Sequence, residues 1–484
     1  MQHSRLFSLF ALAIASFGCA AVGPDYQAPE PLEPDAWQHG GRTTVPIEAP
    51  EVLAEWWQRL DDPTLTAWIE RALLGSPDVD AATARLRRAR ALLTVQRADR
   101  LPSLDAEGSA SFSDPSDATA PGVDSQELYS AGFDASWELD LFGRVRRSVE
   151  AAEAELTAST LDLATVRTSL AAEVAGAYID LRTFQQRLQL AVANRDAQYD
   201  TFELARSRFN AGLVSRLDVE QARANLERTR SQIPTLRAGI ERSANRLLVL
   251  AGEAPGSDQA LSTVAPLPAT PTRIAVGIPA DALRRRPDVR AAERRLAAET
   301  ARIGIATAAL YPRFGLTGSI GVESLDLDGL TDSGAGFFGL VPSVSWRLFD
   351  RRAVRADIEA QTATQAEALA AYEATVLRAL EEVENSLVGY VEEVQRQEAL
   401  RTAVAAAQRA ASLAADLYRS GLRTFQDVLD AQRTLLDLQD QLALSEGSTV
   451  LEVVRLYKAL GGGWTPLAPL DFNDRGVSAA GDSR

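Results

Sequence analysis

The sequence predicts an α+β membrane protein in which one unit, made of strands and long helices, occurs twice. The first observation is an internal repeat, because Pro77-Asp78-Val79 returns as Pro287-Asp288-Val289 within an ordered series of such matches. The second is a change of apolar spacing inside each copy, from three and four residues to two and back again. The third is the length of two proline-free stretches, which begin at Arg144 and Arg352. A repeat this long indicates a duplicated structural unit, not a solenoid of short repeats.

Composition excludes several classes of function. The chain has 484 residues and a formal net charge of −16, and such a surface repels the phosphates of nucleic acids. It contains two histidines and one cysteine, so neither a Cys/His zinc site nor a histidine-based catalytic triad can be assembled. Carboxylate chemistry remains possible in principle, but we find no glycine-rich phosphate loop and no nucleophile elbow. We therefore expect no enzymatic activity, no metal site and no cofactor.

The N-terminus carries an export signal. Arg5 is followed by an apolar run from Leu6 to Phe17, which has signal-peptide length and is too short to span a bilayer as a helix. This predicts a signal peptide over residues 1–18, followed directly by Cys19. A lone cysteine there suggests a bacterial lipoprotein with diacylglycerol and an N-acyl chain such as palmitate on Cys19, whereas the alternative is ordinary signal cleavage nearby. The proline-rich residues 19–50 then form an extended, lipid-anchored tether.

Each repeat contains two stretches in which apolar and polar residues alternate. In the first repeat, residues 51–254, a short helix ends near Gly75 and a second helix runs from Pro77 to about Arg100. The alternation that follows predicts strands with one apolar and one polar face, joined by polar loops. The predicted strands cover about 102–113 and 128–141 in the first repeat, and about 312–323 and 337–349 in the second repeat, residues 284–461.

Strands of about ten residues with one apolar face fit a transmembrane β-barrel, with lipid outside and water inside. The alternative is a sandwich in a soluble domain, but the chain has only two hairpins, and isolated hairpins are marginal in water. Four strands cannot close a barrel around water, and unpaired strand edges cannot lie in lipid. Several chains must therefore contribute. Three chains would give twelve strands and an open lumen, so the geometry favours a trimer.

Two very long helices follow the strands. Helical hairpins are predicted at about 144–252 and 352–460, with Gly212 and Gly421 as suitable stops at their turns. The longer arm of either hairpin would reach about 100 Å. Abundant alanine and mixed apolar spacing suit close helix packing, and the alternative is a solvated coiled-coil stalk. A proline-rich linker over residues 255–283 joins the repeats, and residues 462–484 form a C-terminal tail.

Together these motifs resemble the TolC/OprM-like outer-membrane factors of Gram-negative tripartite efflux and secretion systems. The resemblance runs from Cys19 to about Leu460. It is carried by Gly23-Pro24-Asp25-Tyr26, by Trp56-Trp57 with Asp62-Pro63, by the strand-to-helix junction Trp137-Glu138-Leu139-Asp140-Leu141-Phe142-Gly143-Arg144, and by Arg285-Arg286-Pro287-Asp288-Val289.

The resemblance implies a homotrimer whose twelve-stranded β-barrel lies in the outer membrane and continues as a twelve-helix coiled-coil α-barrel across the periplasm. It implies an equatorial domain formed by the segments near 52–75, the linker and the C-terminus. It also implies an efflux channel that is lipid-anchored in the outer membrane, with an inner-membrane pump, of RND type, and a periplasmic adaptor as partners. Small molecules would leave through the lumen, although the sequence does not reveal which ones.

A closed periplasmic entrance is the functional site that the resemblance implies. The segment from Tyr418 to Ala431 is similar to the entrance segment of the family. By this match Asp427 and Asp430 would form acidic rings, and Tyr418 and Arg423 would belong to the links that hold the coils together. The first repeat keeps Asp218 but has Gln221 in place of Asp430 and Val214 in place of Arg423. Only the second hairpin therefore carries the full set of predicted gate residues.

Helix capping is an alternative role for two of these acids. Thr424 and Asp427 are three residues apart at a helix start, as are Ser215 and Asp218, and this is the spacing of a capping box. Both roles remain open for Asp427, whereas for Asp218 we favour capping. Asp430 lies one turn further into the helix, where capping no longer accounts for a carboxylate.

Other classes of protein share part of this pattern. A trimeric coiled-coil surface fibre or adhesin without transport would also have long helices and barrel strands. A periplasmic adaptor would be lipidated and rich in coiled coil but would lack membrane strands. A secretion channel for polypeptides would use the same architecture as an efflux channel. The fibre leaves the repeated helix–hairpin–helix units and the entrance motif unexplained, and the adaptor leaves the strands unexplained. Lipidation of Cys19 with Ala20 after it favours small-molecule efflux over polypeptide secretion, so we favour the efflux channel.

Overall fold

The computed structural model describes residues 21–30, 36–39, 44–45, 51–116, 118–119, 121–122, 124–256, 263–270, 274–275 and 279–465. The predicted signal peptide, Cys19 and most of the C-terminal tail lie outside the described residues. The chain divides into two compact units. The first unit comprises Met1–Leu32, Ala82–Leu163 and Asp288–Val376, and the second comprises Glu33–Ala81, Ala164–Pro287 and Leu377–Arg484.

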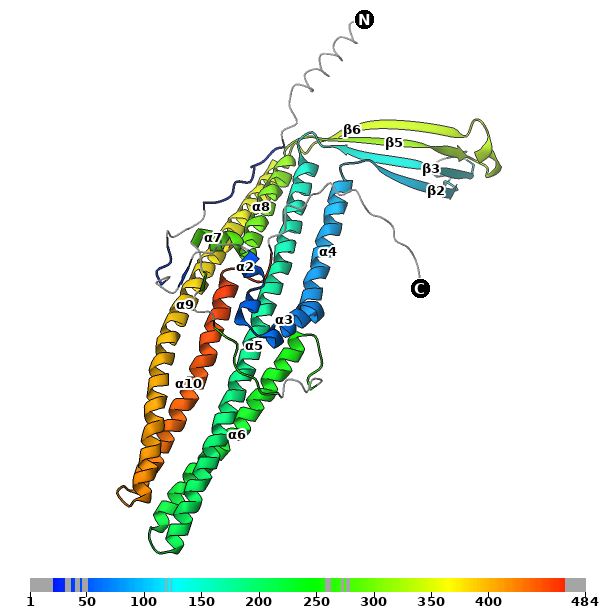
Figure 1. The fold of residues 1–484 in the computed structure, drawn as a ribbon. Helices are drawn as coiled ribbons and strands as arrows, with labels where there is room; N and C mark the ends of the chain where they lie inside the picture. The colour runs from blue at the N-terminus through cyan, green and yellow to red at the C-terminus, as the bar shows by residue number, and fades with distance from the viewer. Residues whose placement is uncertain are drawn as a thin grey trace. The chain divides into compact units, whose positions relative to one another are not determined.

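The first unit contains a four-stranded antiparallel sheet, whose strands lie side by side in Figure 1 in the order β2-β3-β5-β6. All four predicted strands are present, and each repeat supplies one hairpin. The central pair, β3 and β5, joins the two repeats. The strands are β2 (Ser103–Ser113), β3 (Gln126–Leu139), β5 (Arg313–Ser324) and β6 (Gly336–Ser345).

Two strand ends differ from the prediction. β6 stops at Ser345, so Trp346 and Leu348 lie beyond the strand that was expected to include them. The Trp346 indole N–H donates to the Leu310 carbonyl at 3.0 Å, and the chain then turns into the next helix. β3 ends at Leu139 because the Leu141 N–H closes a tight turn onto the Leu139 carbonyl. The polar loop predicted between β5 and β6 contains a short 3-10 helix, η3 (Asp328–Thr331).

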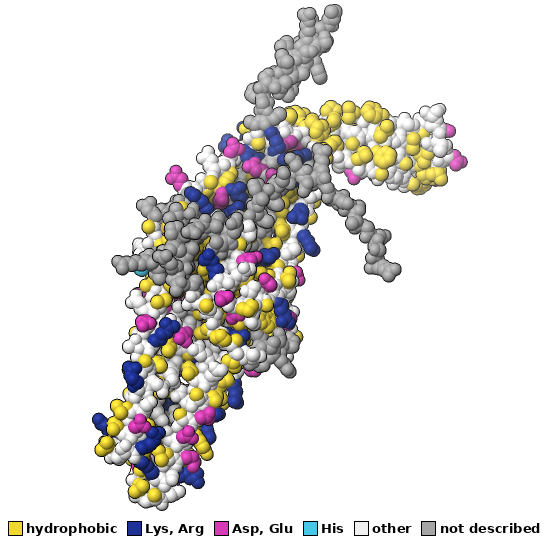
Figure 2. All heavy atoms as spheres, in the orientation of Figure 1, with side chains coloured by type: hydrophobic (Ala, Val, Ile, Leu, Met, Phe, Trp, Pro, Cys, Tyr) yellow, Lys and Arg dark blue, Asp and Glu magenta, His cyan; other side chains and the backbone are white. Residues whose placement is uncertain are grey.

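The register of the sheet separates an apolar face from a polar one. Phe133 lies opposite Ile320, which lies opposite Phe338, and these side chains are 53%, 58% and 75% exposed. Figure 2 shows hydrophobic side chains spread over the strands. The polar face carries Ser103 opposite Ser136, with their hydroxyl oxygens 2.8 Å apart. Since the apolar side chains stay exposed among the described residues, the chain does not bury this face in a sandwich of its own.

The helices that flank the sheet in the first unit are α4 (Pro77–Ala98), α8 (Pro287–Ala308) and the N-terminal parts of α5 (Arg144–Asn210) and α9 (Arg351–Arg419). The two repeats make equivalent contacts where these helices meet the sheet. The Trp137 indole N–H donates to the Arg100 carbonyl at 3.2 Å, as Trp346 does to Leu310. This equivalence supports the duplication inferred from the sequence.

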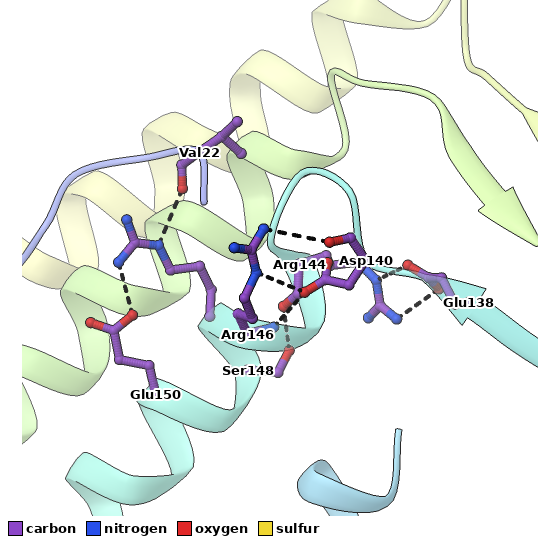
Figure 3. A network of polar contacts seen from close by, with 8 residues as sticks. Val22, Glu138, Asp140, Arg144, Arg146, Ser148 and Glu150 are labelled. Atoms are coloured by element: carbon purple, nitrogen blue, oxygen red, sulfur yellow. Dashed lines mark hydrogen bonds and ion pairs between the residues drawn. The ribbon is translucent and has the colours of Figure 1, made fainter. Parts of the chain in front are cut away.

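The junction from β3 to α5 is held by paired charges, shown in Figure 3. Arg144 donates twice to the Glu138 carboxylate at 2.8 Å, and the Arg146 backbone N–H donates to Asp140 at 2.9 Å. The buried Arg147 side chain pairs with Glu150 and binds the N-terminal segment through the Val22 carbonyl, at 3.2 Å.

Arg147 also pairs with Asp25 at 2.7 Å, so the segment directly after the predicted tether start is fixed to α5. Gly23 has a φ of +91° and lies close to Gly304 of α8. A Cβ on Gly23 would be 2.5 Å from the Gly304 Cα. Tyr26 donates to Glu293 at 2.9 Å, and burial together with this hydrogen bond raises the pKa of the Tyr26 hydroxyl. Residues 21–30 are extended, as the proline content predicts, but they are packed against helices.

The second unit packs the remaining helices around a core that includes Trp56, Tyr178 and Tyr457. Trp56 and Tyr457 stack with ring centroids 5.6 Å apart. The helices are α2 (Glu51–Ala54), η1 (Trp56–Leu60), α3 (Pro63–Gly75), α6 (Arg216–Leu250), α7 (Pro279–Arg285), α10 (Phe425–Ala459) and the C-terminal parts of α5 and α9. A two-stranded parallel pair, β1 (Thr44–Val45) with β4 (Ile274–Ala275), completes the unit.

The inter-repeat linker is bound to α5 through one buried cation. Arg182 donates to the Thr263 carbonyl at 2.7 Å and to the Tyr178 hydroxyl at 3.0 Å. Tyr178 in turn donates to Asp62, which caps α3. The start of α7 falls within the predicted linker, where no helix was expected.

Close approach of helices in the second unit depends on glycine. A Cβ on Gly447 of α10 would lie 2.2 Å from the Thr183 hydroxyl of α5, and a Cβ on Gly239 of α6 would lie 2.7 Å from the Phe184 ring. The long helices thus pack at two sides of α5, as their alanine content and mixed spacing predict. In the described ranges every helix lacks the apolar stretch that a membrane-spanning helix requires.

Candidate gate at the helical hairpin ends

The two helical hairpins of the second unit turn in the same way. α5 ends with Gly212 at a φ of +73°, and the Leu213 N–H donates to the Arg208 carbonyl at 2.9 Å. α9 ends with Gly421 at a φ of +74°, and the Leu422 N–H donates to the Leu417 carbonyl at 2.9 Å. These hydrogen bonds are those of the Schellman motif, which needs a residue tolerant of positive φ at the helix end. Both glycine stops predicted from the sequence are confirmed.

Asp218 and Asp427 occupy equivalent capping positions after these turns. The Asp218 carboxylate accepts from the Ser215 N–H at 2.9 Å, and Asp427 accepts from the Thr424 N–H at 3.0 Å and its hydroxyl at 2.8 Å. These hydrogen bonds, with a smaller contribution from the charge of Arg423, lower the pKa of the Asp427 carboxyl. Asp427 is thus held ionised at the start of α10, where the helix dipole also favours a negative charge.

Asp430 has a different environment. Its side chain is 58% exposed, so it points out of the packed surface of α10. The carboxylate accepts from the Gln426 amide at 3.0 and 3.1 Å and lies 3.4 Å from the Arg433 guanidinium. None of these contacts belongs to a cap, and all of them come from α10 itself. An exposed carboxylate of this kind is free to face a lumen or a neighbouring chain.

Tyr418 links the two hairpins of one chain. Its ring is buried, packs on Phe425 with centroids 5.2 Å apart, and lies below the Arg208 guanidinium at 4.5 Å. Arg208 also donates to the backbone carbonyls of Tyr418 and Arg419, both at 3.3 Å. The surrounding apolar cluster draws on α5, α6, α9 and α10 and comprises Phe202, Ala205, Val219, Ala222, Leu226, Tyr418, Phe425, Val428 and Leu429.

Among the described residues the Tyr418 hydroxyl is buried without a hydrogen-bond partner. A buried hydroxyl that stays unpaired costs about 1–3 kcal/mol. Arg423 is exposed in the turn before α10, and its counterpart Val214 is half-buried. The four predicted gate residues therefore lie within one hairpin end, two of them exposed, one half-buried and one buried.

Arg208 was missed by the sequence reasoning. Its position in the last turn of α5 suits a cation near the C-terminus of its own helix. The sequence gives no sign that it also donates to carbonyls of α9. Only the fold brings it to the end of α9, where four carbonyls of any helix lack internal partners. The described residues hold no group of three or more His, Cys, Asp or Glu side chains arranged for a metal.

Comparisons with known proteins agree with this architecture. The chain matches the family model of the outer membrane efflux protein over residues 68–253 and 278–462. It is 34% identical to nodulation protein T of Rhizobium leguminosarum bv. trifolii, covering 97% of this chain and 99% of that protein. It is 33% identical to the toluene efflux pump outer membrane protein TtgI of Pseudomonas putida, covering 94% and 98%.

Solved structures share the fold. The outer-membrane channel OprN superposes with a TM-score of 0.87 at 37% identity, covering 92% of this chain and all of that one. The open state of the MtrE outer membrane channel of Neisseria gonorrhoeae superposes with a TM-score of 0.83 at 28% identity, covering 92% and 99%. The fold class and the role in efflux that the sequence predicted are thereby confirmed. With its four-stranded sheet and two helical hairpins, the chain belongs to the outer membrane efflux protein family.

Proposed function

We propose that three copies of this chain form the outer-membrane exit duct of a tripartite efflux pump. The duct would pass small molecules that an inner-membrane transporter and a periplasmic adaptor deliver to it. The observation that carries the proposal is the sheet, whose apolar face is exposed and whose terminal strands β2 and β6 each leave one edge unpaired within the chain. Unpaired edges are not tolerated in lipid, so each β6 must meet a β2 of another chain.

Three chains are the smallest closed ring that fits a duct. Two chains would supply eight strands, and the interior of such a barrel is filled by side chains, whereas twelve strands leave an aqueous lumen. The polar face then lines the lumen and the apolar face meets lipid. Transport through such a duct needs no bond-making step, which agrees with a sequence that lacks recognisable catalytic motifs.

The hairpin ends supply the gate of this duct. Asp427 and Asp430 would give the trimer six carboxylates around a narrow axis, and their mutual repulsion favours bound cations. Tyr418, through its packing with Phe425 and Arg208, and Arg423, which is exposed, would take part in the contacts that keep the ends together. Opening is then a shift between two states, biased by the adaptor.

Lipid attachment at Cys19 would anchor the N-terminus in the outer membrane. The Val22 N–H donates to the Phe142 carbonyl at 3.1 Å, so the chain three residues after Cys19 is fixed at the β3–α5 junction. Acyl chains on Cys19 could reach the membrane from there, since each extended residue spans about 3.3–3.6 Å. A small-molecule cargo is supported by relatives whose names refer to toluene and solvent efflux. The inner-membrane pump that we propose as the partner is of RND type.

Ion conductance in a planar bilayer tests the proposal. The purified protein is compared with its Asp427→Ala/Asp430→Ala double variant and with a control, Glu220→Gln/Asp416→Asn, which removes two exposed acids at the same hairpin ends. We expect discrete channels, small for the natural protein and the control and larger for the double variant. Folded, inserted protein without conductance in any form would exclude a duct and leave a structural fibre as the better account.

A further inference from the structure

The two strand-to-helix junctions of the first unit differ in charge. At the β3–α5 junction, Arg144 and Arg146 are paired with Glu138 and Asp140, and Arg147 is paired with two acids of its own. The β6–α9 junction contains Arg347, Arg351, Arg352 and Arg355 beside a single acid, Asp350. All four arginines are exposed, and none has a hydrogen bond or an ion pair within the described part of the chain.

Apolar side chains are exposed at the same junction. Phe349 is 101% exposed, Leu348 51% and Trp346 47%. The Arg351 guanidinium lies 6.0 Å from the centroid of the Trp346 ring, so cations and aromatic surface are contiguous. Trp346 is held in place by its hydrogen bond to Leu310. A fully exposed phenylalanine is unfavourable in water. Aromatic and apolar side chains next to exposed arginines suit the boundary between lipid tails and headgroups.

A structural role does not account for these arginines. Arg351, Arg352 and Arg355 lie in the first turns of α9, where the positive end of the helix dipole disfavours cations. The equivalent junction in the other repeat folds with its charges neutralised, so the fold itself does not require free cations here.

We propose that the β6–α9 junction binds the phosphate headgroup of an anionic phospholipid from the periplasmic leaflet of the outer membrane. Arg347, Arg351 and Arg352 would contact the phosphate, while Phe349 and Leu348 enter the acyl region. Clusters of arginine next to a membrane-embedded segment attract anionic headgroups. A headgroup phosphate would pair with the arginines that have no acidic partner at this junction in the described residues. The inference rests on the outer-membrane position of the sheet. In a closed trimer it predicts one such site per chain.

Native mass spectrometry of the purified, full-length protein in non-ionic detergent measures this binding. Phosphatidylglycerol and phosphatidylcholine with the same acyl chains are added in parallel, and bound lipids are counted per assembly. We expect a preference for phosphatidylglycerol that disappears in about 1 M salt, which screens exposed charges. The variant Arg347→Gln/Arg351→Gln/Arg352→Gln should bind phosphatidylglycerol roughly 100-fold more weakly.

The matched control is Arg228→Gln/Arg237→Gln/Arg242→Gln, which removes three exposed arginines from α6 and should bind as the natural protein does. Equal binding of the two lipids by the natural protein would overturn the proposal, even if the junction variant fails to fold. The proposal would also fail if the junction variant kept its bound lipid but no longer formed oligomers. That result would mean that the arginines pair with acids of a neighbouring chain. Bilayer conductance of the natural protein, recorded separately, shows whether the duct itself is intact.

Discussion

The guanidinium of Arg208 covers the ring of Tyr418 and donates to the Tyr418 carbonyl, so one side chain of α5 closes the C-terminal end of α9. The same carbonyl already accepts from Gly421 at 3.0 Å in the turn. Because the Arg208 side chain is half-buried, its hydrogen bonds are partly shielded from water. This contact holds together two hairpins that come from different repeats, and they would have to separate if the entrance opened by moving the coils apart.

Replacement of Arg208 should loosen the hairpin ends. Charge-assisted hydrogen bonds contribute about 1.5–3 kcal/mol each, and the 3.3 Å distances place these two at or below the low end. We expect Arg208→Ala to shift the closed–open equilibrium by about 1.4 kcal/mol, a tenfold larger open fraction in single-channel records. Arg208→Lys keeps the charge but not the planar fork, so its open fraction should be intermediate. Identical records for all three proteins would show that this contact does not limit opening.

Asp430 should determine how multivalent cations block the duct. With its exposed carboxylate held only by α10, Asp430 offers a ligand oxygen to a cation on the axis. We expect Asp430→Ala to weaken block by a trivalent cation added on the periplasmic side by about tenfold or more, measured as the half-blocking concentration. Glu241→Ala, which removes an exposed acid of α6, is the control and should leave block unchanged. An unchanged block in Asp430→Ala would remove this residue from the lumen.

Acid should release the cap at the start of α10. Because the pKa of Asp427 is lowered in the folded chain, its stabilising effect is complete above the ordinary pKa of an aspartate and is lost as the pH falls through the lowered value. The Thr424 amide donates to Asp427, so it should be protected from hydrogen exchange at neutral pH. Its protection factor should fall only below about pH 4. In Asp427→Asn the acid-dependent step should vanish. A step that persists in the variant must come from another group.

Gly447 should tolerate no side chain. Glycine-to-alanine changes in a helix interior normally stabilise by about 1 kcal/mol, because alanine is the better helix former. Here the new Cβ would lie 2.2 Å from Thr183, and overpacking typically costs about 1–3 kcal/mol. Gly447→Ala should therefore lower the midpoint of thermal unfolding, whereas Gly334→Ala, with no atom within 4 Å of the new Cβ, should not. A raised midpoint for Gly447→Ala would mean that α5 and α10 can separate at no cost.

The polar face of the sheet should make the duct selective for cations. Asp105 lies directly opposite Asp134, and neither carboxylate has a hydrogen bond or an ion pair within the described residues. Like charges in this position repel unless cations or water lie between them. Asp105→Asn/Asp134→Asn should shift the reversal potential in a salt gradient toward the anion side. The same reversal potential in both proteins would place these acids away from the conducting path.

Much of this fold follows from local sequence patterns. Alternation over Leu104 to Phe112 specifies a strand with two distinct faces, and the absence of proline after Arg144 allows one uninterrupted helix. The capping contacts of Ser215 and Thr424 also follow from spacing, since a cap involves residues only three positions apart. The predicted ends of the strands were less accurate. The end of β6, for example, depends on the hydrogen bond from Trp346 to the distant Leu310 carbonyl.

Contacts between distant segments could not be predicted. Arg208 and Tyr418 are 210 positions apart and lie near equivalent positions of the two repeats, but the repeat does not reveal that these two helix ends touch. The burial of Arg147 against Val22 and Asp25 is of the same kind, since an arginine near a helix start normally suggests a solvated side chain. Which acids of the hairpin ends face a lumen is likewise not a property of one chain. That information resides in the assembly.

The two open edges of the sheet have a consequence for the biogenesis of this protein. A newly exported chain cannot finish its own sheet, because β2 and β6 find partners only in other copies. Until it meets them, it carries strand edges and uncovered apolar side chains that invite aggregation and proteolysis. Yield should therefore rise more steeply than in proportion to the rate of export, since every completed ring requires several chains to meet before chaperones or proteases remove them.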